Sequence, residues 1–173
     1  MNSCSGGSDK EYMSLFKAAP HLETVSLAHN RFLSGKCLFG LTRTSVRHLV
    51  LDGCNNLQSK FLGNALRELT YLTHLSLNAC ISLSTSDISV LASAVPRLLS
   101  LSMAHYFPLV QSKALCNVAS LVDLLCLNLQ QNPAVNDDVM MEIANNCKNL
   151  EDLDITGACT TVHSKLNKTK EKL

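Results

Sequence analysis

The sequence has no tryptophan, few other aromatic residues and no excess of charge of either sign. Aromatic residues make up 5% of the 173 residues, and the formal net charge is +1. Nucleic-acid-binding proteins use basic surfaces and aromatic stacking platforms, so we expect no nucleic-acid partner. No apolar run approaches the length of a membrane span, and the polar start MNSCSGGSDK lacks the apolar core of a secretory signal. We therefore expect no membrane partner.

Motifs of catalytic, cofactor and metal sites are missing as well. The sequence holds eight cysteines but no C-x-x-C pair, no Walker loop, no G-x-G-x-x-G, no H-E-x-x-H and no G-x-S-x-G. We therefore expect no catalytic residue, no cofactor and no metal ion, and we predict that the protein is not an enzyme. Most of the cysteines are expected to pack in the core of a protein of a reducing compartment, cytoplasmic and/or nuclear.

The sequence does contain an internal repeat, which is best formed in residues 72–98. This stretch begins with the pattern L-x-x-L-x-L-x-x-C from Leu72 to Cys80, continues through the turn and cap residues 84–87, and ends a helical pattern at Pro96. The first position of the pattern recurs at residues 22, 46, 72, 98, 124 and 150, so the spacing is constant after a slightly shorter first interval. One strand and one helix cannot bury their apolar faces alone, so the repeats must stack.

The pattern resembles the cysteine-containing leucine-rich repeat, a subclass found in F-box leucine-rich-repeat proteins and in the antagonist-of-mitotic-exit family. The resemblance covers roughly residues 4–159. It is carried by the 26-residue period, by Cys54 and Cys80 at the ninth position, and by Cys147-Lys148-Asn149-Leu150 at the end of a helix. Asn30, Tyr106 and Asn132 depart from the cysteine at the ninth position. Asparagine there can hydrogen-bond the backbone of the turn, and cysteine fills a similar small buried space.

The resemblance implies an α/β leucine-rich-repeat solenoid of about five to six repeats, with parallel strands on a concave face and helices on a convex face. We expect a flexible start at 1–8, a repeat domain at 9–162 and a basic flexible tail at 163–173, which serves either as an interaction segment or as a solvated end. The expected strands lie near 22–27, 46–51, 72–77, 98–103, 124–129 and 150–155. The expected helices are 60–69, 87–95, 112–121 and 137–146.

The beginning of the chain aligns with the middle of a repeat. Cys4 precedes Leu22 by the same interval by which Cys80 precedes Leu98, and in this register Leu15 matches Leu91. We expect either a fragment or short isoform of a longer protein, or a helical cap that imitates a repeat. Without a cap, the first strand and helix would present an edge through which the chain can self-associate.

Side chains at the third and fifth positions of each repeat are expected to face the concave surface and to contact a partner. This face is polar and carries little charge, and it becomes acidic towards residues 151–154. The candidate partner-binding residues are His48, Val50, Thr73, His74, Ser76, Asn78, Ser100, Ser102, His105, Cys126, Asn128 and Gln130. We expect replacement of Ser76 by alanine to have little effect on stability.

Two of these positions raise the question of chemistry. His48 and His74 are neighbours in one column and permit three interpretations: ordinary polar surface, a pH-sensitive contact with a partner, or two ligands of a metal site that lacks its third and fourth ligands. Cys126 would need a histidine beside it to act as a nucleophile. Its column neighbours are Ser100 and Asp152, so a contact residue is the better interpretation. Cys54, Cys80, Cys116 and Cys147 are expected to be core residues.

The function implied by the resemblance is substrate recognition for an F-box-type cullin–RING (SCF) ubiquitin ligase. Residues 1–20 hold a single helical pattern and no F-box helices, so a ligase adaptor is an expected partner only if an F-box lies in a longer form. The alternative is a stand-alone repeat scaffold or a short regulatory isoform that binds the same protein partner without a ligase.

Overall fold

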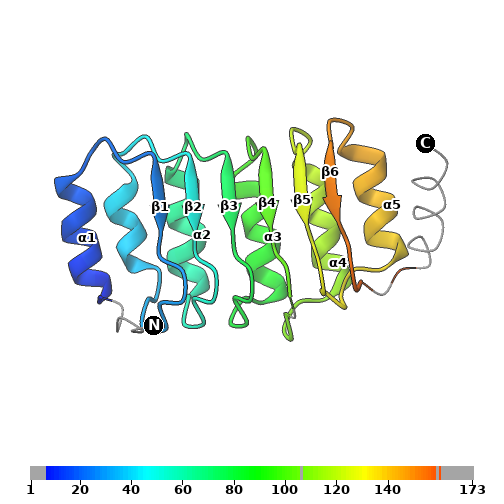
Figure 1. The fold of residues 1–173 in the computed structure, drawn as a ribbon, viewed down its shortest axis with the longest axis horizontal. Helices are drawn as coiled ribbons and strands as arrows, with labels where there is room; N and C mark the ends of the chain where they lie inside the picture. The colour runs from blue at the N-terminus through cyan, green and yellow to red at the C-terminus, as the bar shows by residue number, and fades with distance from the viewer. Residues whose placement is uncertain (1–6, 106, 159, 161–173) are drawn as a thin grey trace.

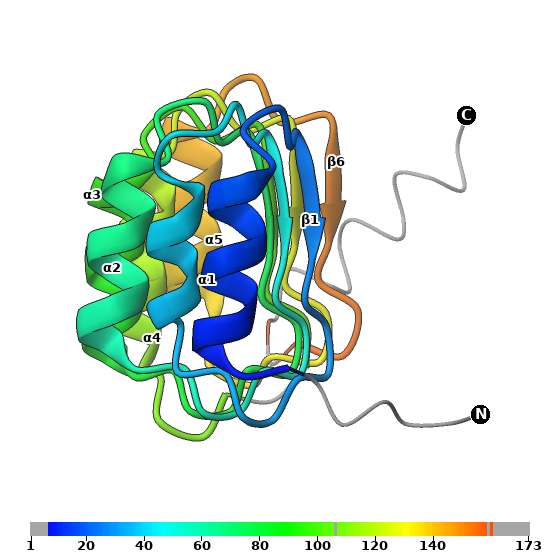
Figure 2. The ribbon, with the colours of Figure 1, turned by 90° about the vertical axis from the view of Figure 1, so that its left-hand side faces the viewer.

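The computed structural model describes residues 7–105, 107–158 and 160, and in them six parallel strands form one sheet in the order β1-β2-β3-β4-β5-β6. The helical segments all lie against one face of this sheet, and its other face, called here the open face, is left uncovered (Figures 1 and 2). The predictions for residues 1–6 and 161–173, and for Tyr106 and Cys159, lie outside the described residues. The strands are Thr24–Ser26 (β1), His48–Val50 (β2), His74–Ser76 (β3), Ser100–Ser102 (β4), Cys126–Asn128 (β5) and Asp152–Asp154 (β6).

Residues that the sequence places in one column of the repeat pair with one another in the sheet. His48 pairs with His74, which pairs with Ser100, so the third position of one repeat always lies beside the third position of the next. Each strand comprises only the third to fifth positions and is shorter than expected. Hydrogen bonds between repeats nevertheless continue to the eighth position, where the Ala79 amide donates to the Ala104 carbonyl at 3.0 Å.

The corner after each strand has one backbone conformation throughout the chain. The residue at the eighth position has a positive φ in all six repeats: His29, Gly53, Ala79, His105, Gln131 and Gly157. This left-handed conformation is unstrained for glycine and costs other residues about 1–2 kcal/mol. It turns the chain off the strand, so this column belongs to the turn rather than to the flat part of the open face.

The ninth position closes the corner from inside, as predicted. The thiols of Cys54 and Cys80 donate to the carbonyls of Leu27 and Leu51 in the preceding repeats, at 3.1 and 3.0 Å. The side chain of Asn132 accepts from the amide of Ala134 at 3.1 Å, so asparagine does bond the turn. Cysteine and asparagine therefore stabilise the same corner through different hydrogen bonds.

The helices lie close to their expected positions. They are Asp9–Ala18 (α1), Ser59–Glu68 (α2), Thr85–Ala94 (α3), Ser112–Leu115 (α4) and Asp137–Asn146 (α5), with 3-10 helices at Lys36–Leu41 (η1) and Cys116–Ser120 (η2). The segment expected as one helix at 112–121 is thus divided between α4 and η2. Ser84 caps α3 as predicted, since its amide and hydroxyl both donate to the Asp87 carboxylate.

The short first repeat contains η1, a helix that the periodicity did not predict. This repeat has less chain than the others, and a 3-10 helix covers more length per residue than an α-helix. A Cβ atom on Gly40 would lie 2.9 Å from the carbonyl oxygen of Met13. Glycine therefore lets η1 pack closely against α1.

The register match of Leu15 with Leu91 does not extend to burial. Phe16 on α1 is buried, but Leu15 is 57% exposed, whereas Leu91 in the matching register is 2% exposed. Within the described chain, η1 is the only helical element packed against α1. The side of α1 that carries Leu15 therefore has no neighbouring helix like the one that covers Leu91. An apolar side chain is left exposed on the first helix of the described chain.

The column assignment makes a prediction for the core. Leu77 at the sixth position of the third repeat is fully buried between strand and helices. Its replacement by alanine should lower the free energy of unfolding by about 2–5 kcal/mol through lost burial and a residual cavity. Urea unfolding followed by circular dichroism measures this change, and Leu109→Ala is the matched control because Leu109 is 57% exposed. Equal stability of the two variants would contradict the assignment.

The left-handed corner predicts opposite effects on stability for two substitutions in adjacent repeats. Gly53→Ala should destabilise the protein by about 1–2 kcal/mol because alanine is strained at positive φ. Its Cβ atom would also lie 2.7 Å from Nδ1 of His29. Ala79→Gly, at the same corner one repeat later, should leave stability unchanged or raise it slightly. Thermal unfolding measures both, and an equal loss in the two variants would contradict the shared left-handed corner.

Candidate functional site

The predicted partner-binding residues lie together along β2–β5 and the adjoining loops. The third- and fifth-position side chains stand on the open face, in step with the strand register. Thr73 directly precedes β3, and Asn78, His105 and Gln130 lie in the corners that follow β3, β4 and β5. The structure thus places the predicted residues next to one another, and Thr24 and Ser26 on β1 extend the row as exposed neighbours.

One group of these side chains is committed to hydrogen bonds within the protein. Asp52 accepts from the Ser76 hydroxyl at 2.6 Å and from the backbone N–H of Asn78 at 2.9 Å. Asn78 in turn accepts from the Ser102 hydroxyl at 2.7 Å and from the amide of Ala104 at 2.7 Å. Bonds to a charged carboxylate contribute about 1.5–3 kcal/mol each. The expected near-neutral effect of Ser76→Ala therefore gives way to a loss of stability of that order.

His48 and His74 form a stack on the open face. Their ring centroids are 4.0 Å apart, and the angle between the ring planes is 22°. The distance between the rings is close to the strand spacing of about 4.8 Å. Nδ1 of His74 lies 2.8 Å from the Thr73 hydroxyl, which holds the ring in orientation. Burial, and second the charge of His48, lower the pKa of His74. The lowered pKa favours the neutral form of the His74 ring.

A second group on this face makes no internal side-chain hydrogen bond. Among the described residues, neither the hydroxyl of Ser100 nor the thiol of Cys126 has a partner, although both side chains are partly exposed. Ser100 lies between His74 and Cys126 in the register, and Asp152 follows Cys126. No histidine therefore neighbours Cys126 in its column. The free polar groups of this region remain open to a partner.

The cysteines predicted to lie in the core are packing residues, with one exception. Cys54, Cys80 and Cys147 are buried as predicted, and burial raises the pKa of the Cys80 thiol to about 12. A thiol with such a pKa carries almost no nucleophilic thiolate at neutral pH. Cys116 was assigned to the core as well, but it is only half-buried, because it lies at the junction of α4 and η2.

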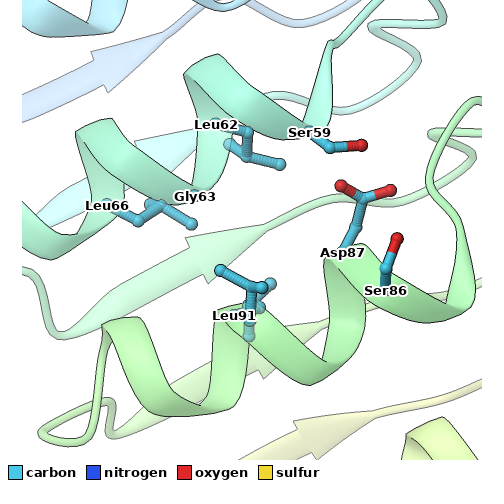
Figure 3. Close-up of a pocket in the computed structure, with 8 residues that line it drawn as sticks. Ser59, Leu62, Gly63, Leu66, Ser86, Asp87 and Leu91 are labelled. Atoms are coloured by element: carbon cyan, nitrogen blue, oxygen red, sulfur yellow. The ribbon is translucent and has the colours of Figure 1, made fainter.

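The described residues show no metal site, and their hollows differ in size. Within the described residues, no cluster of three or more histidine, cysteine or acidic side chains has the arrangement of a metal site. An apolar groove along α5, lined by Met140, Met141 and Leu153 among others, has a volume of about 580 Å³. A crevice between α2 and α3 has a volume of about 90 Å³ and lies between Leu62 and Leu66 on one side and Leu91 on the other (Figure 3). This is far below the roughly 300–1,000 Å³ of typical ligand pockets. It is a packing gap between helices beside Gly63.

No helix among the described residues is long and apolar enough to cross a lipid bilayer. No protein-family model matches the sequence, and no curated protein matches it either.

Solved structures do match this arrangement of strands and helices. The yeast Rad7–Elc1 complex aligns with a TM-score of 0.64 and 22% identity, over 87% of this chain and 36% of that chain. The complex of TLR13 with ssRNA13 aligns with a TM-score of 0.63 and 20% identity, over 83% of this chain and 20% of that chain. The chain has the leucine-rich-repeat fold. Its neighbours are much longer, since the matched part is about a third of one and a fifth of the other.

The likeness confirms the predicted α/β leucine-rich-repeat solenoid, and at these identities it shows the fold alone. The finer cysteine-containing subclass stays a prediction. One neighbour of this solenoid is a complex with RNA, so the comparison does not support the expectation that nucleic acid is excluded as a partner.

The histidine stack predicts a dependence of stability on pH. Because the pKa of His74 is lowered from 6.5 in the folded state, the unfolded state binds the proton more readily, and stability falls as pH drops below about 6.5. The melting temperature should therefore fall between pH 7.5 and pH 5.5, and His74→Asn should reduce that fall. The carboxyls with lowered pKa, Asp9 and Glu11, act below this window.

His105→Asn is the control for this measurement, because His105 contacts Gln131 and lies outside the stack. It should keep the wild-type fall in melting temperature. A fall of equal size in wild type and His74→Asn would contradict the assigned effect.

Proposed function

We propose that the protein is a non-enzymatic binding module of a reducing compartment, cytoplasmic or nuclear, and that it holds a protein partner on its open face. The observation that carries this proposal is the difference between the two sides of the sheet. Leu49, Leu75 and Leu101 are 1–2% exposed and face the helices. The side chains before and after each of these leucines on the same strand stand on the open face, which no described helix covers. That face is continuous over six strands, which suits a broad contact.

The chemistry of the open face supports a protein partner. Beside the histidine stack, Val50, Ser100 and Cys126 are small and partly exposed, and neither the Ser100 hydroxyl nor the Cys126 thiol has a hydrogen-bond partner among the described residues. A surface without strong charge favours contacts made by shape, hydrogen bonds and apolar burial. The C-terminal side differs, since Glu151 and Asp152 are exposed there, and it favours a basic segment of the partner.

The finer proposal is that this module recognises substrates for an F-box-type ubiquitin ligase. It is supported by the sequence resemblance to the cysteine-containing repeat subclass, whose corner cysteines make the bonds described above. A ligase adaptor would be contacted by an F-box in a longer form and not by the repeats. The second candidate, a scaffold or short regulatory isoform, uses the same face without a ligase.

Capture from cell extract with the purified full chain tests the binding face. Val50→Arg places a long cation in the middle of the open face and should weaken a protein partner at least about tenfold, or roughly 1.4 kcal/mol. Asn145→Arg adds the same charge on α5, on the helical side, and should leave capture unchanged. Quantitative mass spectrometry of the bound proteins is the measurement. Identical capture by wild type and both variants would contradict binding through the open face.

The same capture separates the two candidate roles. Cullin and adaptor peptides among the proteins lost with Val50→Arg would support the ligase role. A retained partner without those peptides would support the scaffold. The second result leaves the binding proposal intact.

A further inference from the structure

We propose that the open face contains a slot for one aromatic side chain of the protein partner, over Ser100 and between His74 and Cys126. This inference deepens the proposed function and depends on it, because it concerns how the open face recognises its partner. Tyrosine and tryptophan fit the slot, since each combines a flat ring with a polar edge.

The first wall of the slot is the imidazole of His74. The ring already stacks on His48 at 4.0 Å on one side, and its other side faces the column position of Ser100. The Thr73 hydroxyl at Nδ1 fixes the orientation of the ring. The wall is therefore held in place from one face and one edge before any partner arrives.

The floor and the second wall are short side chains. Ser100 extends much less far from the sheet than the imidazole beside it, and Cys126 occupies the next column position. His74 and Cys126 are thus two strand spacings apart, about 9.6 Å. A ring midway lies about 4.8 Å from each, which suits stacking on His74 and a sulfur–aromatic contact at about 5 Å.

The unpartnered polar groups fit the same occupant. The hydroxyl of Ser100 and the thiol of Cys126 make no hydrogen bond within the described residues, whereas Ser76 and Ser102 in the neighbouring column are both bonded internally. The free hydroxyl at the floor can bond the phenol oxygen of tyrosine or the indole N–H of tryptophan. The free polar groups therefore lie where there is also room for a ring. A charged side chain would use the polar groups but not the stacking surface, and an aliphatic side chain would fill the space without bonding the polar groups.

A titration of the full chain with N-acetyl-tyrosinamide at pH 7.5 tests the slot directly. Proton NMR of the histidine ring signals should show saturable shifts at His74, with a dissociation constant on the order of 1 mM. Ser100→Leu fills the slot and should weaken the probe at least tenfold. Thr24→Leu adds the same bulk in the same column on the far side of the stack, and it should leave binding unchanged.

Two further measurements test the slot independently of Ser100→Leu. His74→Ala, which has no His74 signal to follow, should need at least tenfold more probe to protect Cys126 from alkylation, and it covers the case in which Ser100→Leu unfolds the protein. Alkylation of Cys126, located by peptide mapping, should slow at saturating probe, while that of the half-buried Cys116 should not. Absent saturation, an equal effect of Thr24→Leu and Ser100→Leu, or stronger binding of adenosine than of the tyrosine probe would each overturn the slot.

Failure of the slot can be told apart from failure of the open face as a whole. If Val50→Arg abolishes partner capture while the probe leaves His74 unshifted and Ser100→Leu captures normally, the face binds the partner without the slot. If Val50→Arg captures normally, the proposed function fails, whatever the probe does.

Discussion

The structure depends on one spatial constraint, which is that each repeat must turn off its strand within the space left by the next repeat. Stacked parallel strands lie about 4.8 Å apart, so the corner after each strand has to be repeated without a bulge. A left-handed residue stands at the eighth position of every repeat. A thiol or amide at the ninth position bonds the turn at Cys54, Cys80 and Asn132, whereas Ala158 occupies this position in the last repeat. The corner recurs at the same position in each repeat, in step with the register of the sheet.

The spacing of leucines predicted much of this architecture. Leucines of one predicted column pair with each other in the sheet, with no shift in register. Helix α5 begins and ends at the expected residues 137 and 146. These features come from burial, which the sequence records directly as apolar residues at fixed intervals. The shorter first interval also marked the first repeat as different, but spacing alone does not distinguish a 3-10 helix from a shorter α-helix, and η1 was missed.

Other features depend on neighbours that a sequence column does not describe. Leu15 has the pattern of a core residue, yet burial needs an element on its far side. Ser76 has the pattern of a free surface residue, yet its hydroxyl donates a hydrogen bond to Asp52 in the preceding repeat at 2.6 Å. The eighth-position corner had a readable signal, since Gly53 and Gly157 stand in the same column. The adjacency of His48 and His74 followed from the register, but their face-to-face packing required side-chain conformations.

The corner also explains why a binding face can vary in this fold with little effect on the core. The core leucines and corner residues determine where each backbone strand lies, while the side chains at the third and fifth positions only stand on it. At the seventh position, just after the strands, side chains such as Asp52 and Asn78 bond to each other and connect neighbouring repeats. Beside these residues, His74 supplies a fixed wall and Ser100 leaves a free hydroxyl at the base of an open space. A preorganised surface loses less entropy when a partner binds, so the side chains that stabilise the strands also favour recognition at the positions they leave open.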